Sequence, residues 1–441
     1  MRLAPRRAGA VVAAVALIAL GGSTTASAAV PGADDGRWYY EATSVAEIHQ
    51  RTTGEGITVA LIDGRVNTDV SELAGADIHP HEPSYCAGTT GGDPYPGTST
   101  EPDARHATSM ATLLVGRDAG LDGQPGIPGV APGITLNTYA SYLEGLPCET
   151  PRGDGDLSDD TVRDAITDGA DIIVVPGTQY MSATVVAEAQ RAGVIVVGAA
   201  GNDGGAITGM PAVFNGVVAT GTLTPDQTLD PGSTSGDRLG VVAPGSRFRA
   251  LTPTWDGYET ASGSSNSSTY TAGVLALLWS LYPEATDGQI LQALVRTTDG
   301  EVKDTWTHDP AWGYGVVNAR VLMTVDPTTF PDVNPFVDDD PNAMPTADEI
   351  GGTAETTAPA TDDETGGTPD PEGAPGDASG TDATPPATTG PGIGAALGAA
   401  AGVVALGAVI TLVLARRRRE PAVAGSDHHD APPTDTRGNH G

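Results

Sequence analysis

The sequence predicts an α/β protein built on a doubly wound, mostly parallel sheet with helices on both faces, together with a C-terminal transmembrane helix. Three observations lead to this prediction. Short runs that are apolar at nearly every position recur along the chain, as in strands covered on both faces. Segments whose apolar residues lie three or four positions apart occur between these runs. A long uncharged stretch lies near the C-terminus.

The N-terminal residues 1–28 have the order of a secretory signal peptide. Arg2, Arg6 and Arg7 precede the apolar run AVVAAVALIAL, and the small residues ASA follow. This order predicts export and cleavage after Ala28. An uncleaved N-terminal anchor is the alternative.

Residues 392–415 carry no charge and exceed the length of about 20 residues that a helix needs to cross a bilayer. Arg416 to Arg419 follow, and arginine beside a span favours the cytoplasmic side. We therefore expect a single-pass protein of the cell membrane, with residues 416–441 as a short cytoplasmic tail and the preceding chain outside the cytoplasm. The alternative, a buried core helix, would need folded sequence after it.

The chain before this span divides into a folded domain, expected at residues 29–335, and an acidic linker at residues 336–391. The linker is rich in Pro, Thr, Gly, Asp and Glu, and it has too few large apolar side chains to offset the entropy of ordering. The net charge of −34 argues against nucleic acid as a partner. The full length suggests about two or three domains, but the folded part that remains is within the size range of a single α/β enzyme domain.

Apolar runs and helical segments alternate through the folded domain, which implies helices on both faces of a parallel sheet. Several of the helical segments begin at Ser, Thr or Asp, and two close on Gly, as helix caps predict. Chemistry in such sheets gathers at the carboxyl ends of the strands. The expected strands are ITVALID (57–63), GADIIVVPG (169–177), GVIVVGAAGN (193–202), GVVATGTL (216–223) and LGVVAPG (239–245), and the expected helices are 106–116, 159–169, 182–193, 268–282 and 286–298.

Four polar positions lie where that chemistry is expected. Asp63 ends the first strand, His106 lies in the first turn of a helix, and Asn202 ends another strand beside glycines. The serine cluster SGSSNSSTYTAG (262–273) runs into an apolar helix. Each alone has an ordinary explanation as a turn, a helix start or a loop. Together they could supply a carboxylate, a base, an oxyanion donor and a nucleophile for acyl transfer.

The two cysteines, Cys86 and Cys148, both lie in the exported part of the chain, where oxidation is allowed. We therefore expect a disulfide between them. Two free buried thiols are the alternative.

With these motifs, the folded domain resembles the subtilisin-like (S8) serine proteases over nearly its whole length. TGEGITVALIDGRV is similar to the family's aspartate motif, RHATSMATLLVG to its histidine motif, and VVGAAGN to its oxyanion asparagine motif. Aligning the later Ala-Gly pair of the family's serine motif places Gly263, Ser264 and Ser265 on its Gly-Thr-Ser. The resemblance thus implies a subtilisin-like fold and selects Ser265 from the cluster.

The resemblance also implies the role of each site residue. Ser265 would attack the scissile carbonyl of a polypeptide substrate, with His106 as general base and then acid. Asp63 would orient His106. Asn202 would form an oxyanion hole with the backbone N–H of Ser265. No cofactor or metal is implied; the acidic loop GDGDLSDD lacks the order of ligands of an EF-hand, and structural calcium is left open.

A narrower resemblance, to mycosins, comes from the parts around the domain. The preceding segment RWYYEATSVAEIHQRTTGEG, the cysteine pair, the Pro-rich linker and the C-terminal span together look like those of mycosins. Mycosins are membrane-anchored subtilases of type VII secretion systems. This resemblance implies contact with the membrane and with components of such a system.

Several residues depart from the family pattern. Ala107 replaces a glycine, Arg65 lies in DGRV where Asp-Thr-Gly-Val is usual, and NSST (266–269) replaces Met-Ala-Ala-Pro. Ala107 could crowd the approach of substrate or of neighbouring backbone, and the four polar side chains need partners. The substrate-binding edge is expected at Pro176, Gly177 and Thr178, where proline removes an N–H that could pair with a peptide. A catalytically weak or inactive subtilase-fold scaffold of a membrane secretion complex is therefore the alternative function.

Overall fold

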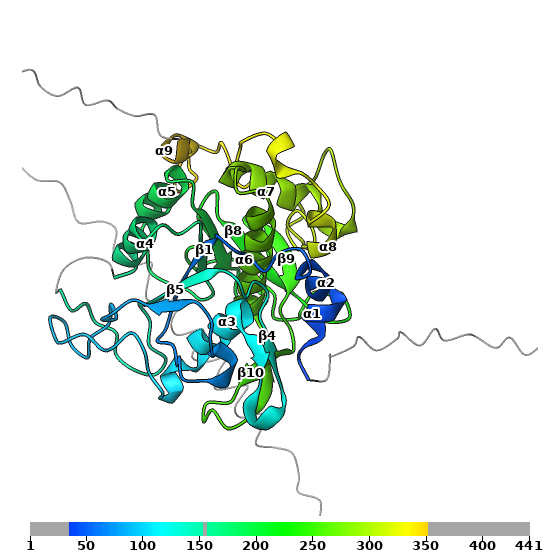
Figure 1. The fold of residues 1–441 in the computed structure, drawn as a ribbon. Helices are drawn as coiled ribbons and strands as arrows, with labels where there is room; N and C mark the ends of the chain where they lie inside the picture. The colour runs from blue at the N-terminus through cyan, green and yellow to red at the C-terminus, as the bar shows by residue number, and fades with distance from the viewer. Residues whose placement is uncertain (1–34, 153–156, 352–441) are drawn as a thin grey trace, which may run out of the picture. The chain divides into compact units, whose positions relative to one another are not determined.

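The computed structural model describes residues 35–152 and 157–351 (Figure 1). The predicted signal peptide, the predicted span at 392–415 and the predicted cytoplasmic tail lie outside these residues. Within the described ranges, no helix combines the length and apolar character that crossing a bilayer requires.

Seven parallel strands form the central sheet, in the order β2-β5-β1-β6-β7-β8-β9. The predicted parallel sheet is confirmed, and all five expected strands belong to it. The sequence did not reveal β2 or β5. In β5, apolar residues alternate with Thr and Asn, so the strand does not appear as a continuous apolar run. The strands are β1 Thr58–Asp63, β2 Ile78–Pro80, β5 Thr135–Ala140, β6 Ile172–Val175, β7 Ile195–Ala199, β8 Val218–Leu223 and β9 Val241–Pro244.

Helices cover both faces of this sheet, as the prediction of a doubly wound fold requires. Neighbouring residues of β1 show the two faces: Leu61 joins the hydrophobic core that includes the helices α3 and α6, and Ile62 joins the core that includes α4 and α5. Figure 1 shows α6 lying across the middle of the sheet. The larger helices are α3 Arg105–Val115, α4 Leu157–Thr167, α5 Ala183–Arg191, α6 Ser264–Leu281 and α7 Asp287–Arg296.

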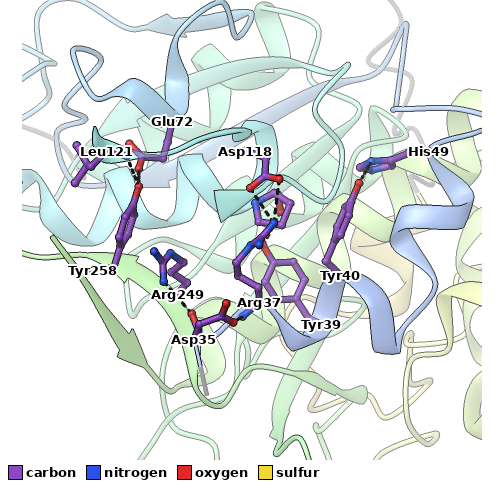
Figure 2. Close-up of polar contacts among 11 residues, drawn as sticks. Asp35, Arg37, Tyr39, Tyr40, His49, Glu72, Asp118, Leu121, Arg249 and Tyr258 are labelled. Atoms are coloured by element: carbon purple, nitrogen blue, oxygen red, sulfur yellow. Dashed lines mark hydrogen bonds and ion pairs between the residues drawn. The ribbon is translucent and has the colours of Figure 1, made fainter. Parts of the chain in front are cut away.

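The segment before the first strand packs onto the domain. Tyr39 is fully buried, stacks on Phe248 with 4.3 Å between ring centroids, and donates a hydrogen bond to the carbonyl of Pro128. Figure 2 shows Arg37 paired with Asp118 near this ring. The smaller elements are α1 Trp38–Ala42, α2 Val45–Ile48, α8 Ala319–Leu322, α9 Ala347–Gly351, and two hairpins, β3 Arg117–Ala119 with β4 Pro125–Pro128 and β10 Phe248–Leu251 with β11 Tyr258–Ala261.

The ordered chain continues past residue 335, so the prediction that a disordered linker begins at 336 is wrong for residues 336–351. Phe336 is 9% exposed and packs against the core. Asn215 holds the same stretch with two hydrogen bonds, from the Asp338 N–H to its Oδ1 (2.8 Å) and from its Nδ2 to the Asp338 carbonyl (3.0 Å). Composition predicted disorder because these partners lie more than a hundred residues away in the sequence.

The predicted disulfide is confirmed. Cys86 and Cys148 are bonded across a sequence separation of 62 residues. The bond joins the loop after β2 to the loop after β5, whose strands are neighbours in the sheet.

Candidate active site

Asp63 is the last residue of β1, the strand that lies between β5 and β6 in the sheet. Its side chain is 4% exposed. Its Oδ1 accepts a hydrogen bond from the N–H of Gly64 (2.7 Å), and its Oδ2 accepts one from Nδ1 of His106 (2.7 Å). A buried carboxylate in this position holds the imidazole in one orientation and leaves Nε2 as the acceptor.

His106 and Ser265 approach from the starts of two helices. His106 is the second residue of α3, and Ser265 is the second residue of α6. The Oγ of Ser265 lies 3.1 Å from Nε2 of His106 and donates to it. The structure thus brings together three of the predicted site residues, since Asp63, His106 and Ser265 form one continuous chain of hydrogen bonds.

The pKa of His106 is raised above its ordinary value. The negative charge of Asp63 is the largest cause, and the hydrogen bond between the two side chains adds to it. Burial opposes the shift, and the positive charge of Arg105 also lowers the pKa. The site thus stabilises the imidazolium that forms when His106 accepts a proton.

Asn202 lies just beyond the end of β7, next to the start of α6. Its Oδ1 accepts a hydrogen bond from the N–H of Ser264 (2.7 Å), which leaves its Nδ2 group as a donor. The Oγ of Ser264 accepts a hydrogen bond from the N–H of Gly201 (3.0 Å). The N–H of Ser265 is in the first turn of α6, where backbone donors have no acceptor within the helix. Two donors thus flank the nucleophile, as an oxyanion hole needs.

A cavity of about 580 Å³ opens beside Ser265. The predicted substrate-binding edge forms one part of its wall, since Pro176, Gly177 and Thr178 all line the cavity. Asn202 and Ser264 line it as well. The cavity connects the candidate nucleophile with the predicted edge, so it could receive a side chain of a bound peptide.

The polar residues that replace the family's apolar helix start all find partners. Asn266 donates to the carbonyls of Gly245 (2.9 Å) and Ala261 (3.2 Å). The hydroxyls of Ser268 and Thr269 are bonded to the Ser265 carbonyl and to the sulfur of Met110, and that of Ser267 lies near Thr222. The side chains of these four residues are therefore buried with hydrogen-bond partners.

Ala107 does not face the substrate. Its side chain is fully buried and belongs to the hydrophobic core. The expectation that its methyl group crowds the approach of substrate is therefore wrong, because the first turn of α3 directs this position inward while His106 faces the site.

Arg65 and Asp103 form an ion pair beside the site that the sequence did not reveal. Nε and one terminal nitrogen of Arg65 each lie 2.7 Å from Oδ2 of Asp103. The only sequence signal was the unusual arginine in DGRV. No spacing rule connects it with an aspartate 38 residues later.

Within the described ranges, no group of three or more His, Cys, Asp or Glu side chains is arranged to hold a metal ion.

Known proteins share this sequence pattern and fold. A halolysin-like extracellular serine protease, Nep, from Natrialba magadii is 29% identical over 280 residues, which cover 62% of this chain and 48% of Nep. Subtilisin E from Bacillus subtilis is 28% identical over 261 residues, covering 56% of this chain and 62% of that protein. The aligned part thus spans about half of Nep and less than two thirds of subtilisin E.

Among solved structures, MycP1 from Mycobacterium smegmatis has a similar fold, with a TM-score of 0.51 and 21% identity over 68% of this chain and 87% of MycP1. At this identity the similarity concerns the fold alone. The model of the Subtilase family matches residues 54–317, more than half of the 441 residues. This chain belongs to the subtilase family, the S8 family of serine endopeptidases.

Proposed function

We propose that this chain is a membrane-anchored, extracytoplasmic serine endopeptidase that cleaves polypeptides with Ser265 as nucleophile. The observation that carries the proposal is the unbroken hydrogen-bond chain from Asp63 through His106 to the Ser265 hydroxyl. Ser265, the last residue of this chain of hydrogen bonds, lines a cavity large enough for a substrate side chain.

The geometry supports a two-stage acyl transfer. His106 takes the Oγ proton as Ser265 bonds to the scissile carbonyl carbon, and Asp63 stabilises the imidazolium. The Nδ2 group of Asn202 and the N–H of Ser265 donate to the oxyanion. His106 then gives its proton to the leaving amine as the C–N bond breaks. Water enters and repeats the sequence on the acyl-enzyme.

Labelling with a fluorescent fluorophosphonate tests this assignment on the full-length chain. We expect the parent and Ser264→Ala to label, because the hydroxyl of Ser264 accepts a hydrogen bond from the N–H of Gly201 and does not contact His106. Ser265→Ala and His106→Ala should not label. Labelling that survives in Ser265→Ala would show that another residue is the nucleophile.

We further propose a mycosin-like role linked to type VII secretion. The support is in the sequence: the signal at 1–28, the acidic linker, the span at 392–415 and the arginines after it. The full chain should fractionate with membranes, and a chain ending at residue 391 should be released. If the shortened chain also stays on membranes, residues 392–415 are not the anchor.

The secretion link has its own test. Proteins exported through a type VII system should differ in processing or amount between cells with the parent chain and cells with Ser265→Ala. Identical exported proteins would argue against a proteolytic role in that system.

One observation favours a second candidate, a weak or inactive scaffold. Pro176 lines the cavity and has no N–H to offer a substrate backbone. If the folded parent fails to react with the fluorophosphonate, the scaffold is the better assignment.

A further inference from the structure

We infer that Arg65 and Asp103 are positioning residues that set the distance and orientation between Asp63 and His106. This inference rests on the proposed function, since it concerns the same catalytic pair. Neither residue lines the cavity beside Ser265, so the pair would act through the backbone segments that carry the catalytic side chains.

The location of the pair suggests this role. Arg65 follows Asp63 by two residues, and Asp103 precedes His106 by three. Their ion pair therefore connects the segment leaving β1 to the segment entering α3. The hydrogen bond between Asp63 and His106 spans the same two segments.

The pair is buried and held on several sides. The side chains are 10% and 5% exposed. The guanidinium of Arg65 also lies 5.5 Å from the ring centre of Tyr95, and Oδ1 of Asp103 accepts from the hydroxyl of Ser99 at 3.4 Å. An arginine restrained in this way fixes orientation as well as distance, because its planar fork limits the directions of its hydrogen bonds.

A second connection lies further along the same segments. The N–H of Asn67 donates to the hydroxyl of Thr108 (2.9 Å), which itself donates to the carbonyl of Ala104 (2.6 Å). The two segments are thus joined twice, at Arg65–Asp103 and at Asn67–Thr108, and these contacts lie before and after His106 on the α3 segment. If the ion pair is lost, one of these two connections remains.

The physical cost of a buried ion pair distinguishes positioning from stabilisation. Apolar residues of similar volume often stabilise a fold as well as such a pair does, because desolvation offsets the attraction between the charges. Catalysis differs, since a displacement of about 1 Å can reduce the rate by about 100-fold. We therefore expect the Arg65–Asp103 ion pair to contribute more to the geometry between Asp63 and His106 than to the stability of the fold.

The test is the double variant Arg65→Met with Asp103→Leu in the full-length chain. It removes both charges together, so neither is left buried without its partner, and it should keep the parental unfolding midpoint. The readout is the downfield proton resonance of the His106 Nδ1–H and its titration. We expect the resonance to shift or broaden and the pKa of His106 to fall, because contact with Asp63 weakens.

The second readout is the rate of fluorophosphonate labelling, expected to fall by about 10- to 100-fold. A control variant, Arg37→Met with Asp118→Leu, removes another ion pair (2.9 Å) that joins distant segments outside the site. It should leave the resonance, the titration and the labelling rate unchanged. Arg65→Lys keeps the charge but not the planar fork. Its resonance, titration and labelling rate should lie between those of the parent and those of the double variant.

The outcomes separate the inference from the proposed function. A folded double variant with the parental resonance, titration and labelling rate would overturn the inference. A changed resonance and titration would support it even if the parent never reacts with the fluorophosphonate, and that lack of reaction would count against the proposed function alone.

Discussion

The side-chain amide of Asn202 offers a direct test of the oxyanion assignment. Its Oδ1 is already occupied by the N–H of Ser264 (2.7 Å), so only Nδ2 remains to donate to a developing oxyanion. The substitution Asn202→Asp keeps the acceptor and removes the donor. We expect kcat to fall by about 100- to 1,000-fold, or about 2.7–4 kcal/mol in the activation barrier. KM should change little, because the oxyanion forms only in the transition state.

Asn202→Ala gives a second, different expectation. It removes the donor and also leaves the N–H of Ser264 without its partner, which costs about 1–3 kcal/mol if that group stays buried. The alanine variant should therefore lose stability that the aspartate variant keeps. Urea unfolding measures this difference.

The assay is the second-order rate of fluorophosphonate labelling, followed by kcat and KM on a peptide amide once a substrate is found. Asn342→Asp is the matched control, since it makes the same chemical change at an exposed residue outside the site. If Asn202→Asp labels at the parental rate, the amide does not stabilise the oxyanion and the reasoning is wrong.

Three further predictions concern pH, the disulfide and specificity. His106 must be neutral to accept a proton, and its pKa is raised chiefly by Asp63, so activity should fall as the pH drops through that raised pKa. Asp63→Asn should move this acidic limb of the kcat/KM profile to lower pH. A limb that does not move would show that Asp63 is not what raises the pKa of His106. Replacing Cys86 and Cys148 by alanine opens a link across 62 residues and should lower the free energy of unfolding in urea by about 4 kcal/mol; an unchanged value would contradict the chain-entropy argument. Asp203 is the one charged residue among the described residues lining the cavity, so peptides with Lys or Arg before the scissile bond should be preferred, and Asp203→Asn should reduce their kcat/KM relative to neutral peptides.

Much of the central fold could be read from the sequence. The strands β1, β6, β7, β8 and β9 are covered on both faces, so each appears as a continuous apolar run that needs no knowledge of its neighbours. β5 escaped detection because its Thr and Asn residues interrupt the apolar pattern. The sequence predicts that α6 starts at residue 268, because a run of serines is typical of a loop, whereas the helix starts at Ser264.

The candidate site was also largely predictable. Asp63 and Asn202 lie at strand ends, His106 and Ser265 lie at helix starts, and parallel strands bring their carboxyl ends to one edge of the sheet. The resemblance to a family then selected Ser265 among its neighbours. The distances between these side chains and their hydrogen-bond partners could not be predicted from the sequence, because they depend on how separate elements pack.

The α/β class, the apolar runs that become strands, the cysteine pair and the residue types available for catalysis can all be predicted from the sequence, because they depend on local composition and spacing. Three features depend on packing between distant segments: the four polar residues after Ser265 fit a buried helix start, the domain continues through residue 351, and Arg65 pairs with Asp103. All three have the same cause. A polar group can be buried only where a partner meets it, and these partners, such as the Gly245 carbonyl for Asn266, come from segments distant in the chain.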